Sequence, residues 1–135
     1  MSKRLDGALL AYYGHVALME GKMPIETIPE IAYLIIDAVA AVYHRKVEEI
    51  FSHSRQAAIV APRNIIMYLL HEKVKLSYLK IGHLLGGRDH STVIHDVRKV
   101  ERFIREDGDY RDCVAAFVLM LRLEDQSNVS TKVSQ

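Results

Sequence analysis

The sequence predicts an all-helical bundle that contains a helix-turn-helix and carries an added helix at its N-terminus. Apolar residues recur at spacings of three and four along most of the 135 residues, which is typical of amphipathic helices. No segment shows the apolar–polar alternation that indicates a half-buried strand. Gly86-Gly87 separates two such helical segments and supplies the tight turn of a helix-turn-helix. Half of the residues are hydrophobic, which is enough for one domain with a buried core.

The N-terminal extension, residues 1–28, holds the first predicted helix. Its apolar side is formed by Leu5, Ala8, Leu9, Tyr12, Val16 and Met19. Gly7 and Gly14 weaken this helix by about 1 kcal/mol each relative to Ala, so it needs tertiary cover. Thr27 to Glu30 have the form of a capping box, which predicts a second helix over residues 29–44.

The helix over residues 29–44 is apolar on nearly all sides and must be covered on more than one of them. Two kinds of cover remain open. The first helix of the same chain can enlarge the core of a monomer. Alternatively, a second copy or a protein partner can dock on residues 5–43.

Four further helical segments follow. We expect one helical turn at 47–51, a loop at 52–61, and a helix that opens at Pro62. Ser77 and Asp89 are expected to cap the next two helices, the second over residues 90–107. Gly108-Asp109 separates it from a last helix over 110–123. The side chains expected to face inward are Ile65, Ile66, Leu69, Leu70, Leu79, Ile81, Leu84, Leu85, Val93, Val97, Val100 and Ile104.

We therefore expect residues 29–123 to form the domain and residues 124–135 to form a flexible tail rich in Ser, Thr and Asn. Charge is uneven along the chain. Residues 55–102 hold 9 Lys/Arg and 4 Asp/Glu, a net of +5, whereas residues 1–54 and 103–135 each carry a net of −2. The basic middle indicates a contact surface for an anion, or else a solvated face.

Several classes of function are not expected. The single cysteine, Cys113, allows no intramolecular disulfide, and a reduced, cytoplasmic setting follows. The longest apolar run, residues 31–43, is too short to span a bilayer, and no signal peptide is visible. His90 and His95 are five residues apart and do not share a helical face, so we expect no metal and no cofactor. With no nucleophile and no implied pocket, we do not expect an enzyme.

The second helix of the predicted helix-turn-helix begins Asp89-His90-Ser91-Thr92. In such units the N-terminal residues of the second helix meet base edges in the major groove. These short polar side chains supply donors, an acceptor and a methyl group for thymine. The free amides at the start of the helix also favour phosphate. This pattern indicates a reader of double-stranded DNA.

The residues around this turn resemble a known family. Ile81-Gly82, the run from Leu85 to His95, and Arg98-Lys99 closely resemble the C-terminal DNA-binding domain (domain IV) of the bacterial replication initiator DnaA family. Ala61-Pro62-Arg63 is similar to the Arg-Pro-Arg that opens the family's basic helix. The resemblance covers about residues 30–122 and implies a helix-turn-helix bundle of the kind also found in the Trp repressor.

The resemblance also implies roles for individual residues. Asp89, His90, Ser91 and Thr92 would read bases, and His95 would touch the backbone or a base. Arg55 would enter an A·T-rich minor groove. Arg63 would contact a base or phosphate, and Arg88 would pair with Asp89 or hold phosphate. The DNA-binding residues expected in full are Arg55, Arg63, Asn64, Arg88, Asp89, His90, Ser91, Thr92, His95, Arg98 and Lys99.

Two departures from the family qualify this expectation. The loop from Ser54 to Ala61 keeps one arginine where the family has several basic residues, which predicts weaker binding to phosphate. No phosphate-binding Gly-x-x-x-x-Gly-Lys-Ser/Thr loop occurs, so we expect no nucleotide. The predicted function is sequence-specific binding at DnaA-box-like sites in replication initiation or transcription regulation, in a bacterial or phage-encoded, nucleoid-associated protein. The alternative is an interaction adaptor or dimerising regulator that uses the apolar N-terminal helices, with DNA binding secondary.

Overall fold

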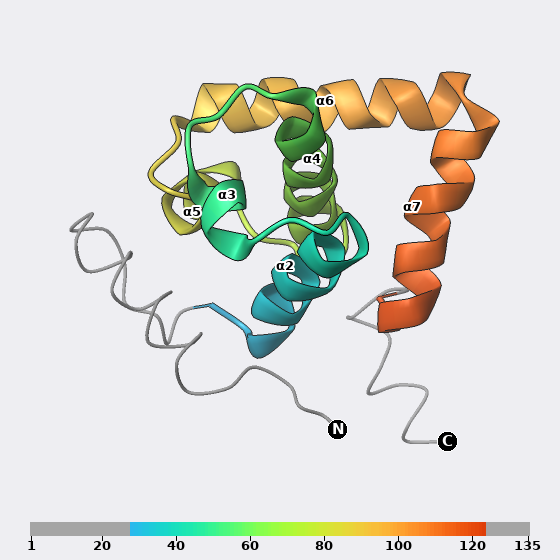
Figure 1. Ribbon diagram of the computed structural model, residues 1–135, viewed down its shortest axis with the longest axis horizontal. Helices are drawn as coiled ribbons and strands as arrows, with labels where there is room; N and C mark the ends of the chain where they lie inside the picture. Colours follow the sequence, from blue (N-terminus) through green and yellow to red (C-terminus); the bar gives the residue numbers. More distant parts are fainter. Residues whose placement is uncertain (1–27, 124–135) are drawn as a thin grey trace.

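The structure, a computed structural model, describes residues 28–123 and is all-helical over them (Figure 1). This confirms the predicted all-α bundle with its helix-turn-helix. The helix predicted within residues 1–28, the capping residue Thr27 and the tail 124–135 lie outside the described residues. The helices are α2 (Glu30–Val42), α3 (Val47–Phe51), α4 (Ala57–Glu72), α5 (Tyr78–Leu84), α6 (His90–Glu106) and α7 (Gly108–Leu121).

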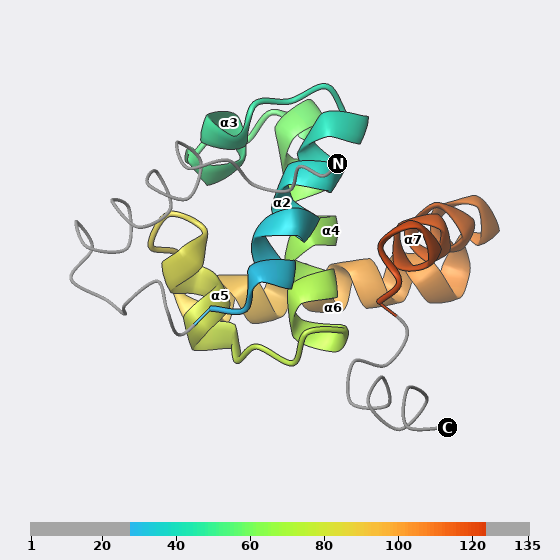
Figure 2. The same ribbon diagram turned by 90° about the horizontal axis from the view of Figure 1, so that it is seen from below.

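Helix α4 lies at the centre and packs against α2, α3, α5 and α6 (Figures 1 and 2). Its inner side is the predicted one, since Ile65, Ile66, Leu69 and Leu70 are all fully buried. The apolar side chains of α2 pack into the same core. Helix α7 turns back from the end of α6, and its Phe117 ring stacks on Tyr43 with the ring centroids 6.3 Å apart.

Two predicted helix starts were wrong. Helix α4 begins at Ala57, so Pro62 lies inside the helix instead of opening it. The earlier start buries Ile59, and Ala57 and Ala58 favour a helix. Helix α7 begins at Gly108 because Asp107 accepts a hydrogen bond from the Tyr110 amide and forms a corner between two helices. Helix α2 begins at Glu30, one residue after the predicted start, with Pro29 at its N-cap position.

The inward faces of the other helices agree with the prediction except at one position. Leu79 is 54% exposed, because α5 turns Ile81, Gly82 and Leu84 toward the core. Val93, Val97 and Val100 of α6 are buried, and Ile104 is partly buried against the core.

The helix-turn-helix is formed by α5, the turn at 85–89, and α6. Both predicted caps are confirmed: Ser77 Oγ accepts from the Lys80 amide at 3.1 Å, and Asp89 Oδ2 accepts from the Ser91 amide at 3.0 Å. Gly86 has a φ of 87°, and a Cβ there would lie 2.5 Å from the carbonyl oxygen of Phe51. Only glycine allows both this conformation and this approach, so the turn rests directly on the end of α3.

Within residues 28–123, no helix combines the length and the apolar character needed to cross a bilayer.

Candidate nucleic-acid interface

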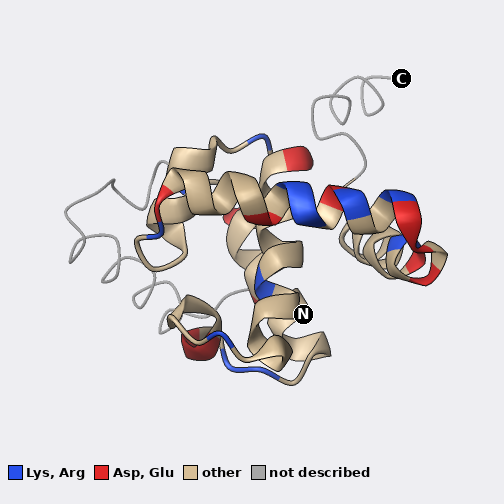
Figure 3. Ribbon diagram, turned by 90° about the horizontal axis from the view of Figure 1, so that it is seen from above, with Lys and Arg blue, Asp and Glu red and all other residues tan. Residues whose placement is uncertain are grey.

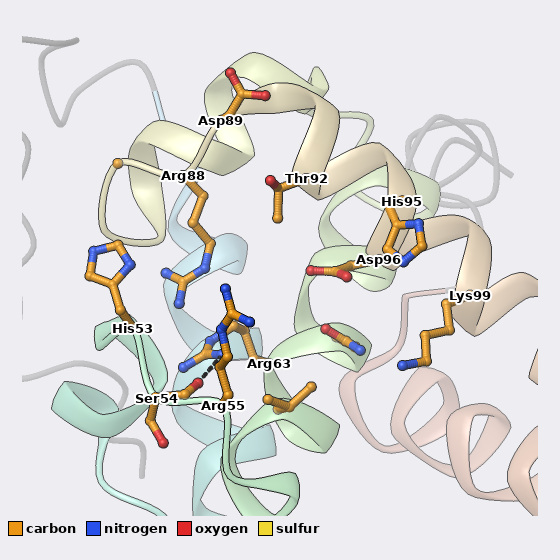
Figure 4. A pocket seen from close by; sticks show the side chains of 13 residues that line it. His53, Ser54, Arg55, Arg63, Arg88, Asp89, Thr92, His95, Asp96 and Lys99 are labelled. Carbon is orange, nitrogen blue, oxygen red and sulfur yellow. Dashed lines mark hydrogen bonds between the residues drawn. The ribbon is translucent and has the colours of Figure 1, made fainter.

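A hollow of about 650 Å³ opens between the loop before α4, the first turns of α4, and the start of α6 (Figure 4). It brings together eight of the eleven predicted site residues: Arg55, Arg63, Asn64, Arg88, Asp89, Thr92, His95 and Lys99. His90, Ser91 and Arg98 do not line it. His53, Ser54, Val60, Gly87 and Asp96, which were not predicted, complete its lining.

The first turn of α6 presents polar side chains to solvent. Asp89, His90, Ser91 and Thr92 are all exposed. The hydroxyl and the amide of Ser91 both donate to Asp89, and these hydrogen bonds hold the pKa of its carboxyl below the ordinary value. Asp89 is therefore an ionised cap that can also accept from a base amino group. The His90 ring lies beside it, with Nδ1 3.9 Å from Asp89 Oδ1.

The loop before α4 carries Arg55 on the opposite side of the hollow (Figure 4). Arg55 is exposed and makes no hydrogen bond or ion pair within residues 28–123. Serine side chains fix the loop, because Ser52 Oγ accepts from the Ser54 amide and Ser54 Oγ accepts from the Gln56 amide, each at 3.2 Å. This anchored loop holds the guanidinium of Arg55, which has no partner within residues 28–123, beside the first turn of α6.

Arg63 lies buried at the wall of the hollow. It is only 4% exposed, and its guanidinium donates to carbonyl oxygens of the main chain. The distances are 2.8 Å to Ile50, 3.0 Å to Ser54 and 2.8 Å to Ser52, with a longer contact of 3.4 Å to Glu49. Burial lowers its pKa, but an arginine stays cationic at neutral pH. Arg63 thus ties the loop 49–54 to α4, and its contact with a base or phosphate stays a prediction.

The Arg88 guanidinium also contacts the loop 49–54. It donates to the carbonyl oxygens of Leu85, Ser52 and, at 3.4 Å, Phe51. Of the two roles that the resemblance implied, pairing with Asp89 is not seen among the described residues, and phosphate binding stays a prediction. Burial, followed by the positive charge of Arg63, lowers the pKa of Arg88 to about 10. Two cations thus meet the carbonyls at the C-terminal end of α3, where the helix dipole favours them. The Ser52 carbonyl accepts from both and links the loop with Arg55 to the turn of the helix-turn-helix.

Asn64 is 6% exposed and lines the hollow, yet its Oδ1 has no hydrogen-bond partner within the described residues. Such buried polar atoms usually have one. An unpartnered amide at the wall of a basic hollow fits a residue that completes its hydrogen bonding on a ligand.

Asp96 is the functional candidate that the sequence reasoning missed. Its carboxylate lines the hollow between Thr92 and Lys99 (Figure 4). Burial raises its pKa, against the opposing effects of His95, Lys99, Arg88 and Arg63. The spacing in the sequence could have predicted this, because Asp96 is four residues after Thr92 and three before Lys99 and so lies on their side of the helix.

Basic residues continue along α6 beyond the hollow (Figure 3). His95 and Arg98 are exposed, and Lys99 is half-buried. By contrast, the described residues contain no group of three or more His, Cys, Asp or Glu side chains placed to hold a metal ion.

A capped recognition helix with exposed polar side chains, set over a basic hollow, defines a helix-turn-helix DNA-binding domain. The family described as the bacterial DnaA protein helix-turn-helix matches residues 32–100, about half of the chain. The chain belongs to this family.

Similar proteins include chromosomal replication initiator proteins DnaA. That of Thermomicrobium roseum is 45% identical over 83 residues, which cover 62% of this chain and 18% of the relative. Those of Anaplasma marginale and Ehrlichia ruminantium are 32% and 31% identical over 133 aligned residues, which cover 89% of this chain and 28% and 29% of the relatives. The chain thus spans less than a third of the length of these relatives.

Proposed function

We propose that the protein binds double-stranded DNA sequence-specifically at DnaA-box-like sites and acts in replication initiation or transcription regulation. The observation that carries this proposal is the row of exposed polar side chains from Asp89 to Thr92 at the start of a recognition helix. Packing does not require these residue types, since none of the four is buried. Their donors and acceptors suit base edges in the major groove.

The remaining predicted site residues suit different parts of the duplex. Arg55, on its fixed loop, suits insertion into a narrow A·T-rich minor groove. His95, Arg98 and Lys99 suit phosphates along the major groove. Asn64 Oδ1 needs a donor, which a base amino group or a bridging water can supply. Arg63 and Arg88 act indirectly by holding the loop and the turn in register.

The function is tested by titrating the protein with a labelled duplex that carries a DnaA box and with a scrambled duplex, at two salt concentrations. We expect clearly tighter binding to the box. His90→Ala and Thr92→Ala should each cost about 1–3 kcal/mol on the box and little on the scrambled duplex. Lys75→Ala is the matched control, because Lys75 is exposed and follows the far end of α4. Equal affinities of the wild type for both duplexes would refute the proposal.

A related experiment tests the minor-groove contact. Arg55→Ala should weaken binding mainly where the sequence beside the box is A·T-rich, since a narrow groove attracts cations. The same loss on G·C-rich flanks would instead indicate a plain phosphate contact.

We further propose that residues 29–123 form the DNA-binding unit in a cytoplasmic protein, with 1–28 as an extension and 124–135 as a tail. Limited proteolysis should leave a fragment with these ends that still binds the box. The alternative partner-docking role of residues 5–43 loses part of its support, because Ile35, Ile36 and Val39 of α2 are completely buried. Residues 5–27 lie outside the described part of the chain.

A further inference from the structure

Three arginines form a row on the outer side of α6, and we call Arg98, Arg102 and Arg105 the α6 arginine row. Spacings of four and three residues place them on one side of the helix, and all three are exposed. Arg102 is also seven residues after His95 and three after Lys99, both of which line the hollow. The row therefore continues from the hollow toward the end of the helix (Figure 3).

The charges of the row are not neutralised within residues 28–123. None of the three arginines is paired with a carboxylate there. Glu101, the acidic residue between them, is half-buried and lies close enough to Tyr68 of α4 to contribute, after burial and Glu72, to the raised pKa of that phenol. Glu101 thus lies toward α4. Glu106, four residues after Arg102, is the exposed carboxylate nearest the row in sequence, and it forms no ion pair with the row within the described residues.

The length of α6 decides what the row can reach. The helix has 17 residues, which correspond to roughly 25 Å at about 1.5 Å per residue. The major groove is only about 12 Å wide. If Thr92 meets a base edge, Arg105 lies about 20 Å further along the axis and outside the groove. A helix that crosses the groove at its first turn would therefore carry its second half past the sugar–phosphate wall.

We propose that the α6 arginine row, through Arg102 and Arg105, binds phosphates of the duplex that flanks the site read by the first turn of α6. This inference rests on the proposed function and extends its footprint. Duplex DNA is favoured over an acidic protein because the row is continuous with the basic hollow. In addition, the exposed large hydrophobic side chains of the described residues, which would anchor a protein partner, lie on other helices: Val42, Leu79, Leu119 and Met120.

The test compares wild type with the double variant Arg102→Gln/Arg105→Gln on two duplexes. One duplex ends at the box, and the other extends it by about one helical turn, roughly 10 base pairs, on each side. On the long duplex, losing two phosphate contacts should reduce the slope of log affinity against log salt by about 1.8. Between 50 and 200 mM salt, wild-type affinity should then fall roughly tenfold more than that of the variant. On the short duplex the two proteins should behave alike.

Two controls accompany the test. Lys73→Gln/Lys75→Gln removes the same charge at the far end of α4 and should leave the slope unchanged. Arg102→Lys/Arg105→Lys keeps both charges and should restore the wild-type slope on the long duplex.

The outcomes separate the inference from the proposed function. A variant slope equal to wild type on the long duplex overturns the inference, and so does an equal reduction on both duplexes, which would place the contacts inside the box. The preference for box over scrambled DNA should survive in the double variant. If wild type itself shows no such preference, the proposed function fails, and the slope on long DNA still decides whether the row binds phosphate.

Discussion

Arg63→Met probes the buried cation that holds the loop 49–54. Methionine keeps an apolar stem of similar length but removes every donor. The Ile50 carbonyl, which accepts from Arg63 Nε at 2.8 Å in a buried place, is left without this donor. The Ser52 carbonyl keeps its bond from Arg88, and the half-buried Ser54 carbonyl can take water. One orphaned buried acceptor costs about 1–3 kcal/mol, and two partly replaced charge-assisted bonds add to it, so we expect a loss of about 2–4 kcal/mol.

Urea unfolding followed by circular dichroism measures this loss. With a denaturant slope of about 2 kcal/mol per molar, the midpoint should fall by about 1–2 M while the slope stays unchanged. Arg102→Met, a matched change at an exposed arginine, should remain within about 0.5 kcal/mol of wild type. Below its unfolding transition, the Arg63→Met variant should keep the preference for box over scrambled DNA. Suppose that the urea midpoint is unchanged and that the slope of log DNA affinity against log salt falls by about 0.9. That result would refute the structural role and show that Arg63 contacts a phosphate instead.

Three further changes test neighbouring features. Asp96→Asn should bind DNA more tightly by about 1 kcal/mol, roughly fivefold, because a carboxylate would be repelled by about that much even in water if a phosphate came to about 4 Å from it. A duplex titration that shows equal affinity for both proteins would contradict this. Since burial raises the pKa of Asp96 above 3.8, this carboxyl favours the folded state at a pH below that value and loses this contribution as pH rises through its folded pKa. Unfolding curves from pH 3 to 7 should therefore show wild type losing stability relative to Asp96→Asn as pH rises, and a constant difference would contradict the cause given for the shift. Gly82→Ala should destabilise the fold by about 1–3 kcal/mol, because a methyl there overlaps the Arg88 carbonyl oxygen, and a thermal melt equal to wild type would refute that contact. Phe117→Ala should cost about 3–5 kcal/mol by emptying the site between α7 and Tyr43, whereas Leu119→Ala, at a side chain 69% exposed, should cost almost nothing.

The features that the sequence predicted well depend on local chemistry. Ser77 and Asp89 were recognisable as caps because their side-chain oxygens reach amides two or three residues along the chain. The turn at Gly86-Gly87 was recognisable because glycine readily adopts positive φ, which both residues show in the structure. The buried faces of α4 and α6 followed from spacing alone.

The features that it did not predict depend on contacts between distant segments. The first turn of α4 forms because it lets Ile59 pack into the core. The stabilisation from this burial is not visible in the local sequence, where Pro62 instead suggests a helix start. The hydrogen bonds from Arg63 and Arg88 to the carbonyls of residues 49–54 were not predicted, because nothing local in the sequence shows that these carbonyls lie beside them. The place of Asp96 in the hollow was not predicted, although its spacing of four residues from Thr92 puts both on the same side of α6.

The exposed start of α6 has a consequence for how such proteins diverge. His90, Ser91 and Thr92 are exposed, while Asp89 is tied to the helix as its cap. If the proposed function holds, substitutions at these three adjacent positions can change the preferred DNA sequence without a compensating change in the core. A library randomised at these positions, with Asp89 held constant, should yield mostly folded proteins that differ in the DNA they select.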